Sequence, residues 1–170
     1  MKAAGVLLAL AATLVLQATL AGLTIEGATL VNLVLVAVIY VALAFGPVTG
    51  MLAGTAGGLV QDALAEGVIG VGGLSKTLIG FIVGVLGAQF IVSQTLPRLV
   101  MFVGATFAHE LCFQALQALV EARPFVMQWS TTLTQAVVNG LIGILAFQVV
   151  ELGPGMLQRR RDRSWSRKRY

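Results

Sequence analysis

Residues 46–84 read GPVTGMLAGTAGGLVQDALAEGVIGVGGLSKTLIGFIVG. The segment places glycines at helical spacing around two isolated charges, Asp62 and Lys76, within an otherwise apolar sequence. Small residues let helix backbones approach closely where no water drives their association. Charges at such depth are costly and need partners. The segment therefore predicts two closely packed helices inside a membrane.

The composition of the 170-residue chain predicts that lipid surrounds it. Hydrophobic residues make up 58% of the sequence and charged residues 11%, whereas soluble domains carry roughly 25% charged residues. Mean hydropathy is +0.93, and a water-soluble fold of this size could not cover so much apolar surface. The single cysteine, Cys112, excludes an internal disulfide and a cysteine-based metal site. We expect neither a metal ion nor a cofactor.

Hydropathy predicts an all-α polytopic membrane protein with about six transmembrane helices, each close to the ~20 residues that cross the hydrocarbon. Turn-forming residues separate the helices, and Gly153-Pro154-Gly155 is expected to end the last one. The predicted spans are residues 3–23, 28–45, 48–65, 74–93, 97–120 and 126–152.

Basic residues lie at both ends of the chain. Residues 159–170 contain seven Lys or Arg and one Asp, a net charge of +6, so the +4 of the whole chain leaves −2 for the rest. Lys/Arg-rich flanks mark the cytoplasmic ends of membrane spans, and Lys2 gives the amino end the same signal. We expect both termini in the cytoplasm, one transmembrane helical domain at residues 1–153 and a basic cytoplasmic tail at 154–170. Such a tail attracts anionic lipid, and we expect no nucleic-acid partner.

Residues at equal distances from a turn lie at similar depths on the two helices of a hairpin. This rule predicts which buried polar side chains meet across neighbouring spans. The matched sets are Asp62 with Lys76, Gln17 with Asn32, and His109 and Glu110 with Asn139.

Helical spacing also groups these residues into two stripes. We expect the first stripe to pack the third span against the fourth and to support contact with a partner. It consists of Gly50, Gly54, Gly57, Gly58, Asp62, Lys76, Gly80 and Gly84. The second stripe predicts a polar seam or small pocket between the fifth and sixth spans, open toward the outer face. It consists of His109, Glu110, Gln114, Gln117, Gln135 and Asn139.

Two of these features allow more than one interpretation. Asp62 and Lys76 form either a structural ion pair that holds one hairpin or a contact with a partner helix or ligand head group. His109 and Glu110 form either a proton relay or a satisfied interior cluster with Asn139.

Two patterns that suggest catalysis fail. His109-Glu110 begins like the HExxH zinc motif, but Phe113 occupies the position of the second ligand. Residues 70–77 are similar to a phosphate-binding loop, but Ser75 replaces the glycine before the lysine and no strand precedes the segment. No serine or cysteine partner for the only histidine is defined by the sequence. We expect no enzymatic activity.

One family shares the pattern of the central segment. The chain resembles the rod shape-determining protein MreD family, and its length and apolar body also fit that family. The resemblance rests on Gly46-Pro47, Gly50, Gly54, Gly57-Gly58-Leu59, Asp62, Gly70, Leu74-Ser75-Lys76-Thr77, Gly80 and Gly84.

The resemblance implies a non-enzymatic scaffold of the bacterial cell-elongation machinery in the cytoplasmic membrane. Members of the family bind the single-span protein MreC and act with the actin-like MreB. They help to localise or activate the glycosyltransferase and the class B penicillin-binding transpeptidase that build the lateral wall. The resemblance also implies a fold similar to the substrate-binding subunits of energy-coupling-factor transporters. A small-molecule, vitamin-type transporter component is therefore the alternative function.

Overall fold

The computed structural model describes the backbone of the chain except residues 1, 21–23, 26–27, 30, 66–67, 91–93, 123, 126 and 167–170. Side chains are described for the same residues except 2–4, 20, 24–25, 28–29 and 151–166. Apart from a pair of two-residue strands, the regular secondary structure of the described part is helical. This confirms the predicted all-α class. In chain order the elements are α1 (Lys2–Leu20), β1 (Thr24–Ile25), β2 (Ala28–Thr29), α2 (Leu33–Phe45), α3 (Pro47–Leu64), α4 (Val71–Gln89), α5 (Thr95–Val120) and α6 (Trp129–Ser166).

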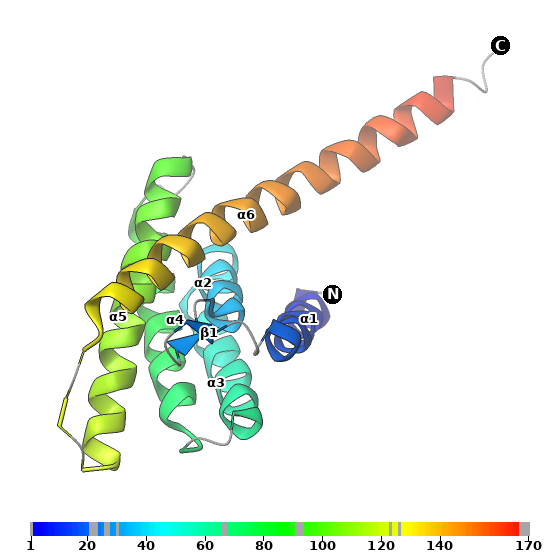
Figure 1. Cartoon of the computed structure of the whole chain (residues 1–170). Helices are drawn as coiled ribbons and strands as arrows, with labels where there is room; N and C mark the ends of the chain where they lie inside the picture. The colour runs from blue at the N-terminus through cyan, green and yellow to red at the C-terminus, as the bar shows by residue number, and fades with distance from the viewer. Residues whose placement is uncertain are drawn as a thin grey trace.

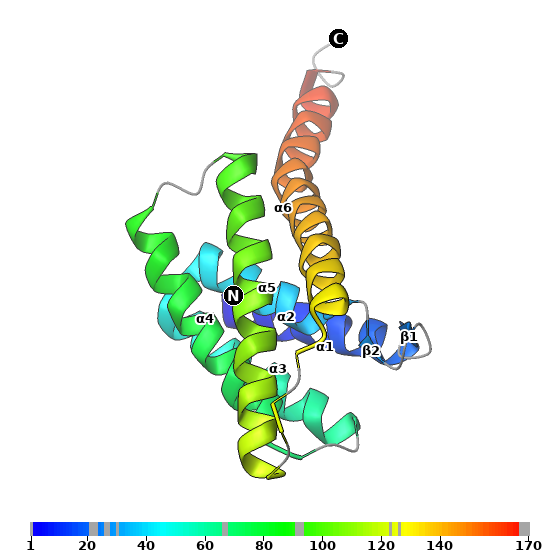
Figure 2. The same ribbon diagram turned by 60° about the vertical axis from the view of Figure 1, so that its left-hand side comes forward.

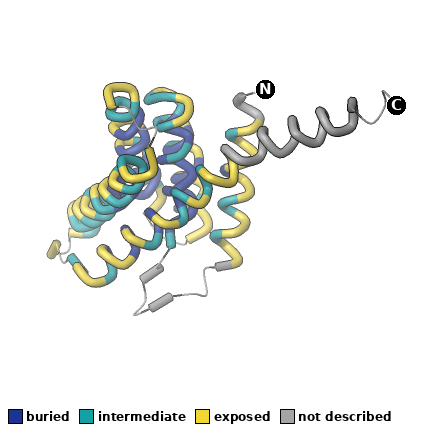
Figure 3. The backbone as a smooth tube through the Cα atoms, turned by 90° about the horizontal axis from the view of Figure 1, so that it is seen from above, coloured by how far each residue is buried: buried dark blue, intermediate teal, exposed yellow. Residues whose placement is uncertain are grey.

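Helix α2 is the centre of the fold, and it contacts every other helix of the described chain. Its side chains Leu35 and Ile39 are fully buried and pack with Ile79 of α4 and Phe102 of α5. The helices surround it in Figures 1 and 2, and Figure 3 shows buried residues in the interior with exposed ones around them. Many of the exposed side chains are large and apolar, as expected of a surface that faces lipid.

The closest helix contact joins α3 to α4, side by side in Figure 1. A Cβ atom on Gly54 would overlap the backbone carbonyl of Lys76, and one on Gly58 would lie 2.6 Å from Gly73 Cα. At the edge of this contact the hydroxyls of Thr55 and Thr77 are hydrogen-bonded at 2.8 Å. Neither backbone could approach this closely if the glycines carried side chains.

The remaining glycines of the predicted stripe also face neighbouring helices. Gly50 and Gly80 lie against each other's backbone, and Gly84 lies against Pro47 at the start of α3. Gly57 instead points toward Val34 of α2, whose Cγ1 would lie 3.0 Å from an added Cβ atom.

Among the residues whose side chains are described, three helices are long and apolar enough to cross a membrane: α4, α5 and the Trp129–Val150 part of α6. Helix α2 is apolar but has only 13 residues, about 20 Å at 1.5 Å per residue, whereas the hydrocarbon is ~30 Å thick. The predicted second span therefore begins too early, because Asn32 caps α2 and β2 precedes it. The six-span count and the cytoplasmic position of both termini stay predictions.

The last helix is longer than predicted. We expected Gly153-Pro154-Gly155 to end it, but α6 continues to Ser166 and extends beyond the other helices (Figure 1). Proline lacks a backbone N–H donor and disfavours helical backbone angles in the residue before it. Pro154 nevertheless does not end α6. The division between a domain at 1–153 and a tail at 154–170 stays a prediction.

The α3–α4 contact predicts different effects of alanine at two helical glycines. Gly54→Ala should lower the thermal unfolding temperature in detergent, since overpacking costs about 1–3 kcal/mol. Gly104→Ala is the matched control, because nothing lies within 4 Å of a Cβ atom at Gly104. Equal melting temperatures for the two correctly inserted variants would contradict the close backbone contact.

Candidate functional site

Asp62, at the end of α3, caps the start of α4. Its Oδ2 atom accepts hydrogen bonds from the backbone N–H groups of Gly70, at 2.9 Å, and Gly73, at 3.0 Å. Gly70 is the N-cap residue of α4 and has no side chain that could accept these donors. A carboxylate at this position satisfies free backbone donors and interacts favourably with the helix dipole. Asp62 therefore performs the N-cap role from the neighbouring helix.

The predicted match between Asp62 and Lys76 is wrong in depth. The glycine contacts set Gly58 against Gly73 and Gly54 against Lys76, so Asp62 lies level with the first turn of α4. Lys76 lies more than one turn further along the helix. Among the described side chains, no direct ion pair joins the two charges.

Ser75, His109 and Glu110 form a buried chain of hydrogen bonds. The Ser75 hydroxyl lies 3.0 Å from the carbonyl of Gly72 and 3.2 Å from His109 Nε2. His109 Nδ1 lies 3.3 Å from Glu110 Oε1. His109 also stacks on Phe113, with the ring centroids 5.9 Å apart. The sequence defined no hydroxyl partner for His109, and the packing of α4 on α5 supplies one.

Both ring nitrogens of the buried His109 have a hydrogen-bond partner. Nε2 pairs with the Ser75 hydroxyl and Nδ1 with the Glu110 carboxyl group. Which nitrogen donates depends on the tautomer of the ring. The imidazole is therefore held by one contact from α4 and one from its own helix, α5.

The order hydroxyl, imidazole, carboxylate also occurs in serine hydrolases. Here, however, Ser75 is completely buried and is not among the residues that line the adjacent cavity. Its proton is held by a carbonyl of its own helix. A substrate in the cavity could not reach this hydroxyl, so the geometry does not form a nucleophilic site.

Asn139 does not join His109 and Glu110, contrary to one interpretation of the sequence. Its Oδ1 atom accepts the backbone N–H of Asn32 at 3.1 Å. The Asn32 side chain in turn accepts the N–H of Leu35 at the start of α2. Gln17 of α1 bonds the backbone on both sides of Asn32, at Val31 O (2.9 Å) and Leu33 N (2.7 Å). The predicted match between Gln17 and Asn32 is thus found at the level of the backbone.

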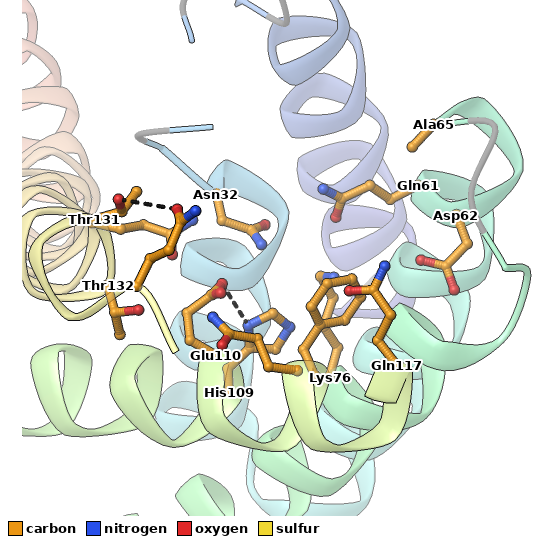
Figure 4. A pocket seen from close by; sticks show the side chains of 14 residues that line it. Asn32, Gln61, Asp62, Ala65, Lys76, His109, Glu110, Gln117, Thr131 and Thr132 are labelled. Carbon is orange, nitrogen blue, oxygen red and sulfur yellow. Dashed lines mark hydrogen bonds and ion pairs between the residues drawn. The ribbon is translucent and has the colours of Figure 1, made fainter. Parts of the chain in front are cut away.

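A polar cavity of about 530 Å³ lies between α3, α4, α5 and α6 (Figure 4). Its deep end contains Lys76 and His109, which are 3% and 2% exposed. At the other end Ala65 and Gln128 are exposed, so the mouth lies near the α3–α4 and α5–α6 connections. The cavity is lined by Asn32, Gln61, Asp62, Ala65, Lys76, His109, Glu110, Phe113, Gln114, Gln117, Gln128, Thr131, Thr132 and Gln135.

Most of the predicted polar stripe lines this cavity. Five of its members do so, whereas Asn139 lies outside the lining. The sequence missed that α3 and α4 contribute to the same cavity through Asp62, Lys76 and Gln61. The position of Gln61 beside Asp62 was the available signal, but adjacent helical residues point about 100° apart. The sequence also placed Thr131 on the polar face of the sixth span, and it lines the cavity. The other missed lining residues are Asn32, Ala65, Phe113, Gln128 and Thr132.

Several polar atoms at the cavity have no hydrogen-bond partner within the described structure. They include Oε1 of Gln61 and Oε1 of Gln114. Lys76 makes neither a hydrogen bond nor a direct ion pair with a described residue, and it interacts through space with Asp62 and Glu110. The described part of the chain contains no cluster of three or more metal-binding side chains. The free groups suit an organic polar ligand.

The apolar exterior, the long apolar helices and the buried polar cavity define a helical membrane protein. A family model described as rod shape-determining protein MreD matches residues 2–152, which include all of the described cavity. The chain belongs to the MreD family, which functions in rod shape determination. The resemblance inferred from the glycine segment is confirmed. No curated protein and no solved structure matches the chain.

The cap provided by Asp62 predicts a graded loss of stability. Asp62→Ala leaves two backbone donors without an acceptor, which should cost about 1–3 kcal/mol. Asp62→Asn keeps one acceptor oxygen and should lose less. Thermal unfolding of the purified variants in detergent measures the difference. If Asp62→Ala melts at the temperature of the unmodified protein, Asp62 is not the cap of α4.

The hydrogen bond between His109 and Glu110 predicts that an amide can replace the carboxyl group. The new side chain of Glu110→Gln has both a donor and an acceptor for Nδ1, so the melting temperature of this variant should stay close to that of the unmodified protein. Glu110→Leu leaves a buried ring nitrogen without a partner, which should cost about 1–3 kcal/mol. A Gln variant as unstable as the Leu variant would show that this hydrogen bond does not contribute to stability.

Proposed function

We propose that this protein is a non-enzymatic membrane scaffold of the bacterial cell-elongation complex and that it binds the transmembrane helix of MreC. It resides in the cytoplasmic membrane with both termini in the cytoplasm. Through MreC it acts with MreB, the elongation glycosyltransferase and the class B penicillin-binding transpeptidase. The family match over residues 2–152 is the observation that carries this proposal.

The α3–α4 pair is the platform in this proposal. The glycines of the pair face inward and cannot themselves contact a partner. On the side of the pair where Thr55 bonds Thr77, two apolar side chains are exposed. Leu59 of α3 is 42% exposed and Phe81 of α4 is 45% exposed. A transmembrane helix of MreC that packs on this face would bury apolar side chains against a rigid helix pair. The glycines, Asp62 and Lys76 then act by fixing the positions of the contact residues.

The surface is tested by photocrosslinking in native membranes. A photoreactive amino acid at Leu59 or Phe81 should produce a covalent adduct with MreC. Leu141 of α6 is 55% exposed and is the matched control, at which we expect no MreC adduct. Adducts at Leu141 alone, with the complex assembled, would place the partner on another face.

The platform itself is tested by co-purification. Gly54→Leu and Gly58→Leu should force α3 and α4 apart and reduce recovery of MreC, since the added side chains have no space. Gly104→Leu, at a position with open space, should recover MreC normally. Unchanged recovery by inserted Gly54 and Gly58 variants would contradict a role for the glycine contact in binding.

The cavity favours a second candidate function, a substrate-binding membrane component of a small-molecule, vitamin-type transporter. In this case Lys76, Glu110, Gln114 and Gln135 would contact the substrate. A bound small molecule that co-purifies with the protein, or that raises its melting temperature by mass action, would support this function. The two functions use different surfaces, so each can be tested separately.

A further inference from the structure

We propose that the cavity binds a compact zwitterion, with the acidic group of the ligand at Lys76 and its ammonium group at the amide oxygens of Gln61 and Gln114. The inference rests on the second candidate function only in requiring that the cavity holds a ligand. It requires neither transport nor MreC.

Lys76 provides the site for the acidic group. The side chain is 97% buried, lines the cavity and makes no hydrogen bond or direct ion pair with a described residue. In Figure 4 it lies between the His109–Glu110 pair on one side and Asp62 on the other. Asp62 is already engaged by two backbone N–H groups, and Glu110 by His109. A buried ammonium group without a direct partner is costly, and an acidic ligand group would provide that partner.

Gln61 and Gln114 provide the site for the ammonium group. They lie on α3 and α5 and both line the cavity. Their Oε1 atoms are buried acceptors without donors in the described structure. An ammonium group has three N–H donors and no acceptor, so it suits a site that offers free acceptors. Free acceptors and a free cation in one cavity are complementary to a ligand that carries both kinds of group.

A ligand that carries both charges disturbs the charge balance of the cavity least. Lys76 and Asp62 are both buried at the cavity and carry opposite charges. A purely anionic or purely cationic ligand would change the net charge of the cavity at low dielectric. A zwitterion adds no net charge.

The size of the cavity fits such a ligand. About 530 Å³ lies within the usual range for small-molecule sites, roughly 300–1,000 Å³. The ammonium–acid combination is available from soluble amino-acid-like molecules and from the phosphoethanolamine head group of a membrane lipid. Both sources present the same two charged groups. Soluble probes in detergent and defined lipids in nanodiscs distinguish them.

The test compares a zwitterion with its two halves. The unmodified full-length protein in detergent is titrated with phosphoethanolamine, with ethanolamine alone and with inorganic phosphate alone, and its melting temperature is followed. Glycine is a second soluble zwitterion, with acetate and methylamine as its halves. A zwitterion should raise the melting temperature at lower concentrations than either of its halves. Halves that are as effective as the whole molecule would overturn the proposal.

The lipid source is tested in nanodiscs. Phosphatidylethanolamine should raise the melting temperature above that in phosphatidylglycerol if the ligand is a head group, with the soluble probes then having no further effect. Soluble stabilisation that is independent of the lipid identifies a soluble ligand. Either result supports the proposal. No stabilisation by a zwitterion in detergent or in any nanodisc overturns it.

Variants assign the two halves to their residues. Lys76→Met should weaken zwitterion binding about tenfold or more and remove its advantage over ethanolamine, since a charge-assisted hydrogen bond is lost. The double variant Gln61→Leu, Gln114→Leu should remove the advantage over phosphate. Gln89→Leu is the matched control, because Gln89 is exposed and does not line the cavity. Unchanged zwitterion binding by the cavity variants would overturn the assignment of the two ligand groups to these residues. If a variant does not insert into the membrane, the comparison of probes on the unmodified protein decides the proposal.

Discussion

The close contact of α3 with α4 determines where the polar groups of this protein lie. Gly54 and Gly58 allow the two backbones to approach to a distance that no side chain could share. In a membrane, water does not drive helices together, so association depends on packing and on interhelical polar contacts. The contact fixes the relative shift of the two helices along their axes. That shift brings Asp62 to the first turn of α4 and leaves Lys76 facing the cavity.

The central helix α2 gives the bundle its dry core, and the polar residues lie to one side of it. Leu35 and Ile39 contact apolar residues of α4 and α5, whereas His109 and Lys76 are buried beside the cavity. The start of α2 is held by polar contacts from distant segments, because Asn139 accepts the backbone N–H of Asn32. Each buried polar group in lipid needs such a partner. The core is therefore apolar around α2, and most of its buried polar side chains lie where partners or the cavity are available.

The protein presents two surfaces of different chemistry. The outer face of the α3–α4 pair is apolar and suits lipid or another transmembrane helix, as the proposed scaffold function requires. The cavity is lined mainly by polar side chains and extends from its mouth to the buried Lys76 and His109, as a small polar ligand requires. The two surfaces share α3 and α4, so the same glycine contact positions both.

The amino-acid sequence by itself determined the helical membrane class, the family and the helix pair that packs through glycine. These follow from hydropathy and from small residues at regular spacing, which are local properties of the chain. The tertiary structure alone decided which polar residues meet. Equal distance from a turn matched Asp62 to Lys76, but the actual shift of the two helices depends on how Gly54 and Gly58 fit α4. Likewise, Ser75 contacts His109, and Asn32 contacts Asn139, across segments that are far apart in the chain. Local sequence patterns do not predict such contacts, because these depend on how the helices pack.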